Sequence, residues 1–197
     1  MLPSGLVAEY ISLKYKTLTL RVCYAEFLHI LRAIRRKRFK NGRLDGKREN
    51  MRLALVGFGV VGRSFAGLLQ LKAAELANKS GLMPKVVCVI DNRSYSQDSN
   101  GLDLGKVLSR KNRSGSVGLP KKGLSSSEII RNTEADVLIE TTQTNFKTGE
   151  PGFSHIKAAF QSKMSVVTAN KGPLAVAFQS LTELARPFSL SLTASAF

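Results

Sequence analysis

The chain has 197 residues, of which 43% are hydrophobic, and 30 Lys and Arg against 14 Asp and Glu give it a formal net charge of +16. This length accommodates one globular domain with an appendage, and the apolar content is sufficient for a full core. Only two cysteines are present, Cys23 and Cys88, which excludes a disulfide framework and a cysteine-based metal site. We therefore expect a cytoplasmic protein without a bound metal. Charged residues interrupt every long apolar run, which argues against a membrane-spanning helix.

Residues 1–50 are predicted to be a basic extension or linker in front of a domain that covers residues 51–197. Apolar residues recur at helical spacing over residues 27–34, four basic residues follow at 35–38, and residues 40–50 are polar and contain glycine. Such a segment can bind nucleic acid or an anionic membrane, or act as a targeting peptide. It can equally be an extension without a folded role, because Met51 stands directly before the first core strand.

The strongest motif begins at the apolar run of residues 53–56, which suits a parallel strand that is covered on both faces. The turn that follows has Gly-x-Gly-x-x-Gly spacing and comprises Gly57, Phe58, Gly59, Val60, Val61 and Gly62. In dinucleotide-binding folds the first glycine allows a tight turn, the second lets backbone approach a pyrophosphate, and the third lets the helix pack close to the strand. We expect these six residues to hold the pyrophosphate at the N-terminus of the helix.

A helix and a second strand complete this unit. Apolar residues recur at three- and four-residue steps between Phe65 and Leu76, which predicts an amphipathic helix with one face on the sheet. Gly81 and Pro84 are expected to end the helix, and residues 85–91 are predicted to form the second buried strand. Cys88, inside this strand, is expected to be a small buried hydrophobe rather than a catalytic group.

The residues expected to determine the preference between NAD and NADP lie at the end of the second strand. In this fold an acidic residue about 20 positions after the motif takes the ribose hydroxyls, and Asp91 lies later, 29 positions after Gly62 (91 − 62 = 29). Arg93 can form a bidentate, charge-assisted pair with a ribose 2′-phosphate, which favours NADP, with NAD as the alternative. Lys111 is the next candidate for this phosphate if the following loop folds back.

The middle of the chain is predicted to be less regular. Residues 92–124 are expected to form a long polar loop with one short helix near 102–108. Ser125 and Glu128 match a capping box, and residues 135–142 form a predicted strand that ends with Thr142 at the edge of the crevice. His155, in a predicted helix over 154–163, is expected to be solvated or capping, because no partner for a base is implied nearby.

The remaining elements continue the alternation of strands and helices. Residues 164–169 form a predicted strand, and Lys171 lies in the turn before a helix that has Pro173 in its first turn. A last strand is predicted over residues 188–193. The buried stripe of the preceding helix is expected to contain Leu174, Ala177, Phe178, Leu181 and Ala185. This alternation indicates an α/β fold, a Rossmann-type doubly wound parallel sheet with a basic N-terminal extension.

Three stretches resemble the homoserine dehydrogenases, in the same order along the chain: residues 57–63, residues 140–151 and residues 166–175. The resemblance spans residues 51–193 and implies NADP-linked interconversion of L-homoserine and L-aspartate 4-semialdehyde. That reaction lies on the path to threonine, methionine and isoleucine. By position the resemblance implies that the glycine turn holds the pyrophosphate, Arg93 the adenosine phosphate, and Thr142 and Lys171 the nicotinamide end.

The resemblance also implies parts that these 197 residues do not include. The family's second domain dimerises, binds homoserine through acidic residues and carries the catalytic lysine, so we expect that lysine beyond the C-terminus and assign no catalytic residue within the chain. No paired carboxylates and no second lysine follow Lys171. We therefore expect the chain alone to bind the cofactor without oxidising homoserine, because nothing would orient the alcohol or take its proton.

A rival hypothesis is a non-catalytic dinucleotide-binding module whose basic arm, residues 18–48, contacts nucleic acid. Binding of this kind would weaken steeply with added salt and disappear when residues 1–50 are deleted. We favour the enzyme, with a small-molecule substrate and with neither a nucleic-acid nor a membrane partner.

Overall fold

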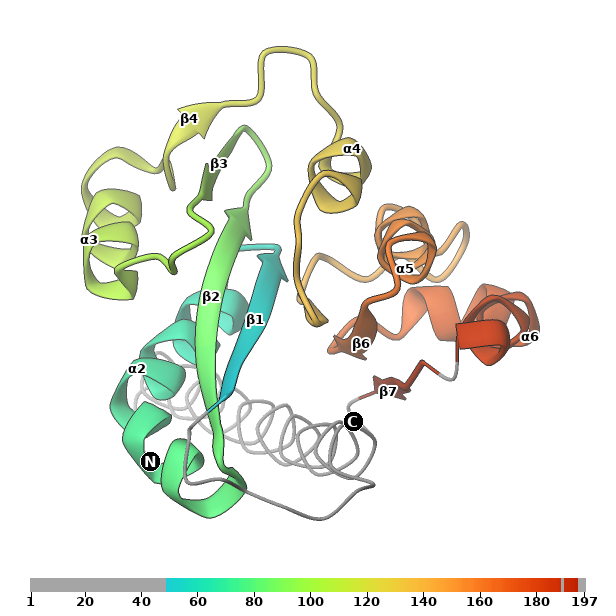
Figure 1. The fold of residues 1–197 in the computed structure, drawn as a ribbon. Coiled ribbons are helices and arrows are strands. Elements are labelled where there is room, and N and C mark those ends of the chain that lie inside the picture. Colours follow the sequence, from blue (N-terminus) through green and yellow to red (C-terminus); the bar gives the residue numbers. More distant parts are fainter. Residues whose placement is uncertain (1–48, 189, 195–197) are drawn as a thin grey trace, which may run out of the picture.

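The computed structural model describes residues 49–188 and 190–194. Of the basic extension predicted over residues 1–50, only residues 49 and 50 lie in this part of the chain, and they belong to the first strand rather than to a linker. Strands and helices alternate along the described residues (Figure 1). In chain order the elements are β1 (Glu49–Val56), α2 (Val60–Ser80), β2 (Leu82–Ile90), β3 (Ser94–Gln97), α3 (Leu104–Ser114), β4 (Leu119–Pro120), α4 (Ser126–Arg131), β5 (Val137–Glu140), α5 (Gly152–Gln161), β6 (Ser165–Thr168), α6 (Gly172–Ala185), the 3-10 turn η1 (Arg186–Phe188) and β7 (Leu192–Ala194).

The described strands form one seven-stranded sheet in the order β4-β3-β2-β1-β5-β6-β7. Strands β2, β1, β5, β6 and β7 are parallel, whereas β3 and β4 form an antiparallel edge beside β2. The chain places β2 on one side of β1 and then places β5, β6 and β7 on the other, so the strand order reverses between β1 and β5. The predicted Rossmann-type fold is confirmed, and this reversal is the point where doubly wound sheets bind ligands.

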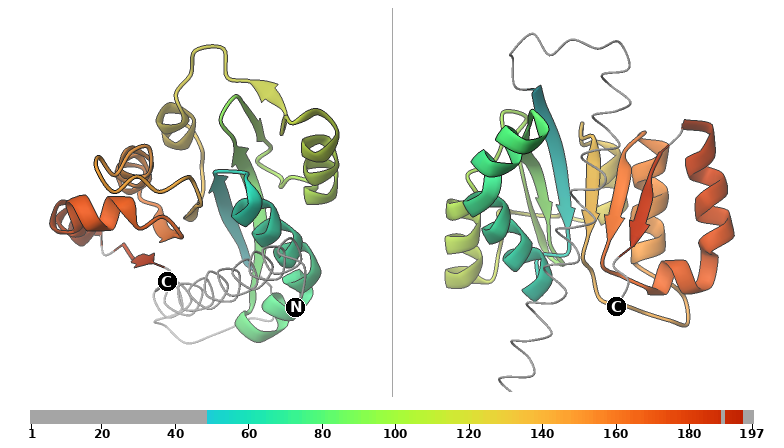
Figure 2. Two further views of the ribbon diagram at one scale, coloured as in Figure 1. Left: turned by 180° about the vertical axis from the view of Figure 1, so that it is seen from behind. Right: turned by 90° about the horizontal axis from the view of Figure 1, so that it is seen from below.

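Helices cover both faces of the sheet, as the apolar strands predict (Figures 1 and 2). Alternate residues of β1 point to opposite faces. Leu53 and Leu55 belong to a cluster with α2 and α3, whereas Ala54 and Val56 belong to a second cluster with α4, α5 and α6. The two clusters form the core that holds the carboxyl ends of β1 and β5 in place.

The first strand–helix–strand unit agrees with the sequence except near Pro84. Helix α2 ends at Gly81, which has a left-handed backbone (φ 72°) and donates its N–H to the Ala77 carbonyl (2.8 Å). Strand β2 begins at once at Leu82, so Pro84 lies within the strand, opposite Met51. The interpretation of Pro84 as a breaker between helix and strand was therefore wrong.

Cys88 is fully buried in β2, as predicted, and burial raises the pKa of its thiol to about 11. Because the thiolate is the reactive form, we expect native Cys88 to resist iodoacetamide at pH 8 and to react rapidly once the protein is unfolded in urea. Peptide-resolved mass spectrometry separates it from Cys23. Equal rates of Cys88 alkylation in native and unfolded protein would contradict this prediction.

Residues 92–124 are more ordered than predicted, because they contain β3, α3 and β4. Asp103 caps α3 by accepting the Lys106 N–H (3.0 Å), and Gly115 ends the helix with a left-handed backbone (φ 70°). The helix predicted near residues 102–108 corresponds to the first half of α3, and its second half, residues 109–114, contains no apolar residue that would reveal its full length.

Helix α6 differs from the prediction in its buried stripe. Leu181 and Ala185 are buried as expected, but Phe178 is 61% exposed. Ala177 has a non-helical backbone (φ −144°, ψ 32°) that kinks the helix. The kink changes the rotational phase between the two halves of the helix. A buried stripe predicted from a constant helical period therefore included Phe178 wrongly.

Candidate functional site

A cavity of about 450 Å³ opens at the carboxyl ends of β1 and β5, where the strand order reverses. Gly57 and Gly59 line it from the turn after β1, and Thr141 and Thr142 line it from the loop after β5. The Thr141 N–H donates to the Val56 carbonyl (2.9 Å), which fixes the two segments side by side. The structure thus brings together the glycine turn and Thr142, which the sequence assigned to opposite ends of one cofactor.

The three motif glycines meet different constraints. A Cβ on Gly57, which has φ +90°, would lie 2.6 Å from the Thr141 carbonyl carbon, and one on Gly62 would lie 2.1 Å from the Gly57 carbonyl oxygen. Nothing lies within 4 Å of a Cβ on Gly59. Gly57 and Gly62 are therefore required by the fold itself, whereas the open space at Gly59 fits the close approach of a ligand.

Gly59 is also the N-cap of α2, and no side chain caps this end of the helix. The first N–H groups of a helix lack partners within it, and its dipole places partial positive charge there. A 21-residue helix that begins at the cavity wall is thus suited to receive a pyrophosphate.

The other predicted motif residues, Phe58, Val60 and Val61, differ in burial. Phe58 is fully buried in the core, and Val61 packs against the same cluster, whereas Val60 is 44% exposed. The side chains of Phe58 and Val61 therefore secure the turn, whereas the Val60 side chain is accessible at the N-terminus of α2.

Asp91 and Lys111 meet at the end of β2. Asp91 lines the cavity, and the Lys111 ammonium forms an ion pair with its carboxylate and donates to the Gly115 carbonyl (2.7 Å). Both side chains are mostly buried, with 14% exposure for Asp91 and 20% for Lys111. Helix α3 thus folds back and brings Lys111 to Asp91, where the ammonium neutralises the carboxylate.

Arg93 lies in the tight loop between β2 and β3, and its side chain is exposed. It is not among the residues that line the cavity, although its neighbours Asp91 and Asn92 are. Its carbonyl accepts the Lys121 N–H (3.2 Å), which anchors the backbone of this loop.

Lys121 lines the cavity and was missed by the sequence interpretation. Its ammonium donates to the Ser126 hydroxyl (2.7 Å). Burial lowers the pKa of Lys121, and the negative charge of Asp91 opposes that shift. Two consecutive lysines shortly before the Ser125 cap were the available signal, but a charged pair in a predicted loop resembles an ordinary solvated surface.

A buried carboxylate, Glu140, organises the opposite end of the cavity. Its Oε1 accepts from the N–H of Thr142 (2.9 Å) and from the Thr142 hydroxyl, and its Oε2 accepts from the Thr168 hydroxyl (2.8 Å). Burial raises the pKa of Glu140, but His155 and these donors outweigh it, so the pKa lies below its ordinary value. Glu140 is therefore ionised at neutral pH and only accepts hydrogen bonds.

His155 is buried rather than solvated, so that expectation was wrong. It lines the cavity from the first turn of α5, and its Nδ1 lies 3.8 Å from Oε1 of Glu140. This Nδ1 has no hydrogen-bond partner among the described residues. The sequence gave no sign of this pairing, because Glu140 and His155 belong to different elements.

Lys171 is the N-cap of α6 and is partly buried, but it does not line the cavity. Its neighbour Asn170 makes the direct connection, because its side-chain amide donates to the Thr142 hydroxyl and to the Gln143 carbonyl, both at 3.3 Å. The structure therefore brings Lys171 to the Thr142 end of the cavity through Asn170, a residue to which the sequence assigned no role.

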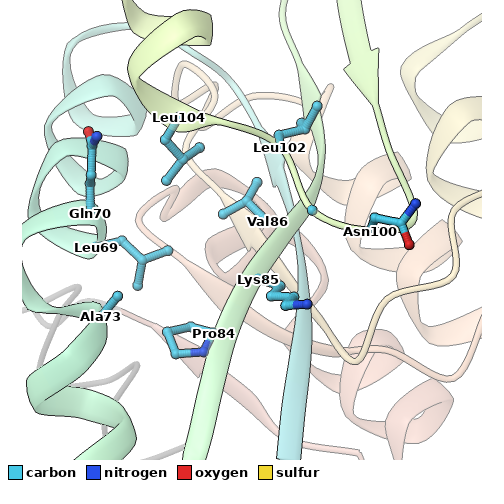
Figure 3. A pocket seen from close by; sticks show the side chains of 10 residues that line it. Leu69, Gln70, Ala73, Pro84, Lys85, Val86, Asn100, Leu102 and Leu104 are labelled. Carbon is cyan, nitrogen blue, oxygen red and sulfur yellow. The ribbon is translucent and has the colours of Figure 1, made fainter.

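A second hollow of about 230 Å³ lies between α2, β2 and the segment before α3. Figure 3 shows Leu69, Gln70 and Ala73 on α2 facing Pro84 and Val86 on β2 across it. Its lining shares no residue with the cavity at the switch point and contains none of the glycine motif. We assign it no function.

Several proteins of known identity are similar to this chain in sequence. A homoserine dehydrogenase of Methanocaldococcus jannaschii is 40% identical over 139 residues, which are 69% of this chain and 41% of that protein. The chain is a homologue of the homoserine dehydrogenases. An NAD(+)-dependent homoserine dehydrogenase of Pseudomonas canavaninivorans is 33% identical over 139 residues, 68% of this chain and 40% of that protein. No family model matches the chain.

A solved structure agrees with this homology. The homoserine dehydrogenase of Thermoplasma acidophilum is 28% identical and superposes with a TM-score of 0.62, over 75% of this chain and 44% of that one. The chain thus spans about two fifths of the length of the homoserine dehydrogenases that it matches. No helix in residues 49–188 or 190–194 is long and apolar enough to cross a membrane, and no cluster of three metal-ligating side chains occurs there.

Proposed function

We propose that this chain supplies the dinucleotide-binding part of an NAD(P)-dependent homoserine dehydrogenase, which interconverts L-homoserine and L-aspartate 4-semialdehyde. The observation that carries the proposal is the cavity at the switch point, with the open space of Gly59 at the N-terminus of α2. The homology to homoserine dehydrogenases supports the choice of reaction. We place this reaction in threonine, methionine and isoleucine biosynthesis.

We propose a position in the cavity for each part of the cofactor. The pyrophosphate lies against the backbone at Gly59, the adenosine ribose beside Asp91, and the nicotinamide toward Thr142 and Asn170. The nicotinamide supplies or accepts the hydride. The chain's own residues bind the two ends of the cofactor, hold the ring in one orientation and exclude water from one side of it.

We further propose a cytoplasmic enzyme that acts on a small-molecule substrate and functions as a homodimer in its whole form. Its catalytic lysine is proposed to lie outside these 197 residues, with Lys171 near the nicotinamide end. The resemblance to the family supports these proposals, which concern the whole protein and not only these 197 residues.

A fluorescence titration with NADPH tests the cofactor part of the proposal. We expect saturable binding that NADP⁺ displaces, and a homoserine-dependent increase in absorbance at the NADPH band for the whole protein at moderately alkaline pH. A protein that binds no nicotinamide dinucleotide would overturn the proposal. Cofactor binding without any homoserine oxidation by the whole protein would assign it to another dehydrogenase reaction.

NADPH is expected to bind more tightly than NADH, because Arg93 directly follows Asp91 and Asn92, which line the cavity where the adenosine ribose is proposed to lie. A charge-assisted bidentate pair contributes on the order of 1.5–3 kcal/mol, so Arg93→Ala is expected to lower NADPH affinity about tenfold to a hundredfold and to leave NADH affinity unchanged. Calorimetric titrations of both cofactors measure this.

Lys157 provides the matched control for Arg93, since it is an exposed cation on α5 that does not line the cavity. Lys157→Ala is expected to leave both affinities unchanged. An unchanged NADPH preference in the Arg93 variant would remove Arg93 from the site and leave Lys121, which lines the cavity, as the candidate phosphate ligand.

A further inference from the structure

Glu140 is the last residue of β5 and is fully buried next to the loop that lines the cavity. An ionised carboxylate is costly to bury unless donors surround it, so the identity of those donors indicates what the carboxylate does. Glu140 lies opposite Thr168 in the register of β5 and β6, and it binds groups on both strands or on the loops that follow them.

The directions of these hydrogen bonds are fixed by the ionised carboxylate. The Thr142 and Thr168 hydroxyls each give their single proton to Glu140, so their oxygens are free to accept. The Thr168 oxygen accepts the Asn170 N–H (3.0 Å), and the Thr142 oxygen accepts from the Asn170 side-chain amide (3.3 Å). Glu140 therefore closes a ring that joins the loop after β5 to the loop after β6.

The ring continues toward α6. The side-chain oxygen of Asn170 accepts the Gly172 N–H (3.0 Å), which fixes the first turn of the helix and, with it, Lys171. His155 covers the same carboxylate from α5 at 3.8 Å. The Glu140 carboxylate thus links the loop after β5, the loop after β6 and the first turn of α6 at the Thr142 end of the cavity.

We propose that Glu140 is a positioning residue that sets the spacing of the two loops, 141–143 and 169–172, that receive the nicotinamide end of the cofactor. It touches no part of the ligand and acts through Thr142, Thr168 and Asn170. This inference rests on the proposed function, since the nicotinamide is assigned to this end of the cavity by the dinucleotide-binding fold. Asp91, at the adenosine end, is held by Lys111, and the glycine turn contacts the loop after β5 through Thr141 rather than through Glu140.

The test compares NADPH with 2′,5′-ADP, which contains only the adenosine half of the cofactor. Thr168→Val removes the link between Glu140 and Asn170 with little change in volume, and Glu140→Gln removes the charge while keeping one acceptor oxygen. We expect Thr168→Val to weaken NADPH binding about tenfold and to leave the affinity for 2′,5′-ADP within about twofold. Glu140→Gln is expected to have a smaller effect in the same direction.

Thr133→Val is the matched control. Thr133 is a buried threonine whose hydroxyl donates to the Ile129 carbonyl (2.7 Å), and it does not line the cavity. We expect this variant to lose some thermal stability and to keep both affinities. Hydrogen exchange of the Asn170 amide, measured by NMR without ligand, should accelerate in Thr168→Val and not in Thr133→Val.

The outcomes separate the two proposals. A wild-type protein that binds neither ligand would overturn the proposed function and this assignment with it. Wild-type binding combined with an unchanged ratio of the two affinities in Thr168→Val, or with equal weakening of both ligands, would show that Glu140 serves only the fold. A selective loss of NADPH affinity together with faster Asn170 exchange supports the positioning role.

Discussion

Replacing Gly62 by alanine is expected to prevent folding, whereas replacing Gly59 by alanine is expected to leave the fold intact and to abolish cofactor binding. A Cβ at position 62 would lie 2.1 Å from the backbone oxygen of Gly57, and neither backbone segment can retreat without displacing α2 from β1. The cost of such a clash exceeds the 1–3 kcal/mol that is typical for overpacking, and domains are stable by only about 5–15 kcal/mol.

At Gly59 the added methyl group meets no protein atom within 4 Å, so circular dichroism and the melting temperature should change little. The methyl group would instead occupy the space in which a pyrophosphate approaches the helix N-terminus, and NADPH affinity should fall by at least about a hundredfold. A folded Gly62→Ala protein, or a Gly59→Ala protein with normal NADPH binding, would contradict the division of roles among these glycines.

Removing the positive charge of Lys111 is expected to reverse the preference between the two cofactors. Lys111→Ala leaves the mostly buried Asp91 carboxylate without its ion-pair partner, at the place where the adenosine ribose is proposed to lie. Like charges in close contact repel, so the 2′-phosphate of NADPH should bind at least about thirtyfold more weakly. The free carboxylate can accept the ribose hydroxyls of NADH, whose affinity should be unchanged or higher.

Paired titrations of NADPH and NADH measure this effect, and two variants control it. Arg113→Ala removes a charge from an exposed position on the same helix and should leave both affinities unchanged. The double variant Lys111→Ala with Asp91→Asn should recover much of the NADPH affinity, because the repelling charge is gone. An unaltered preference in Lys111→Ala would show that the ion pair of Lys111 with Asp91 does not influence the choice of cofactor.

Several parts of the fold could be predicted because their signals are local. Gly57, Gly59 and Gly62 specify a turn through backbone geometry alone, and the apolar runs of β1, β2, β5 and β6 are typical of strands covered on both faces. The Ser125–Glu128 capping box is present as predicted, since both of its hydrogen bonds lie within four consecutive residues.

Other parts could not be predicted, because their signals are weak or are overridden by packing. The sequence predicted a short helix near residues 102–108 but not the full length of α3, because its second half, residues 109–114, is polar; β3 and β4 contain no apolar run. The exposed position of Phe178 depends on the kink at Ala177, which no pattern of residue types indicated.

The sequence by itself thus determined the first strand–helix–strand unit and its glycine turn, because both depend on residues that are close along the chain. Only the tertiary structure decided which charges meet. Lys111 reaches Asp91 through the return of α3, and Glu140 meets Thr168 and His155 through the parallel pairing of β5 with β6 and the packing of α5. These partners are 15 to 28 residues apart, and a pattern of residue types contains no information about such contacts until the strands are in register.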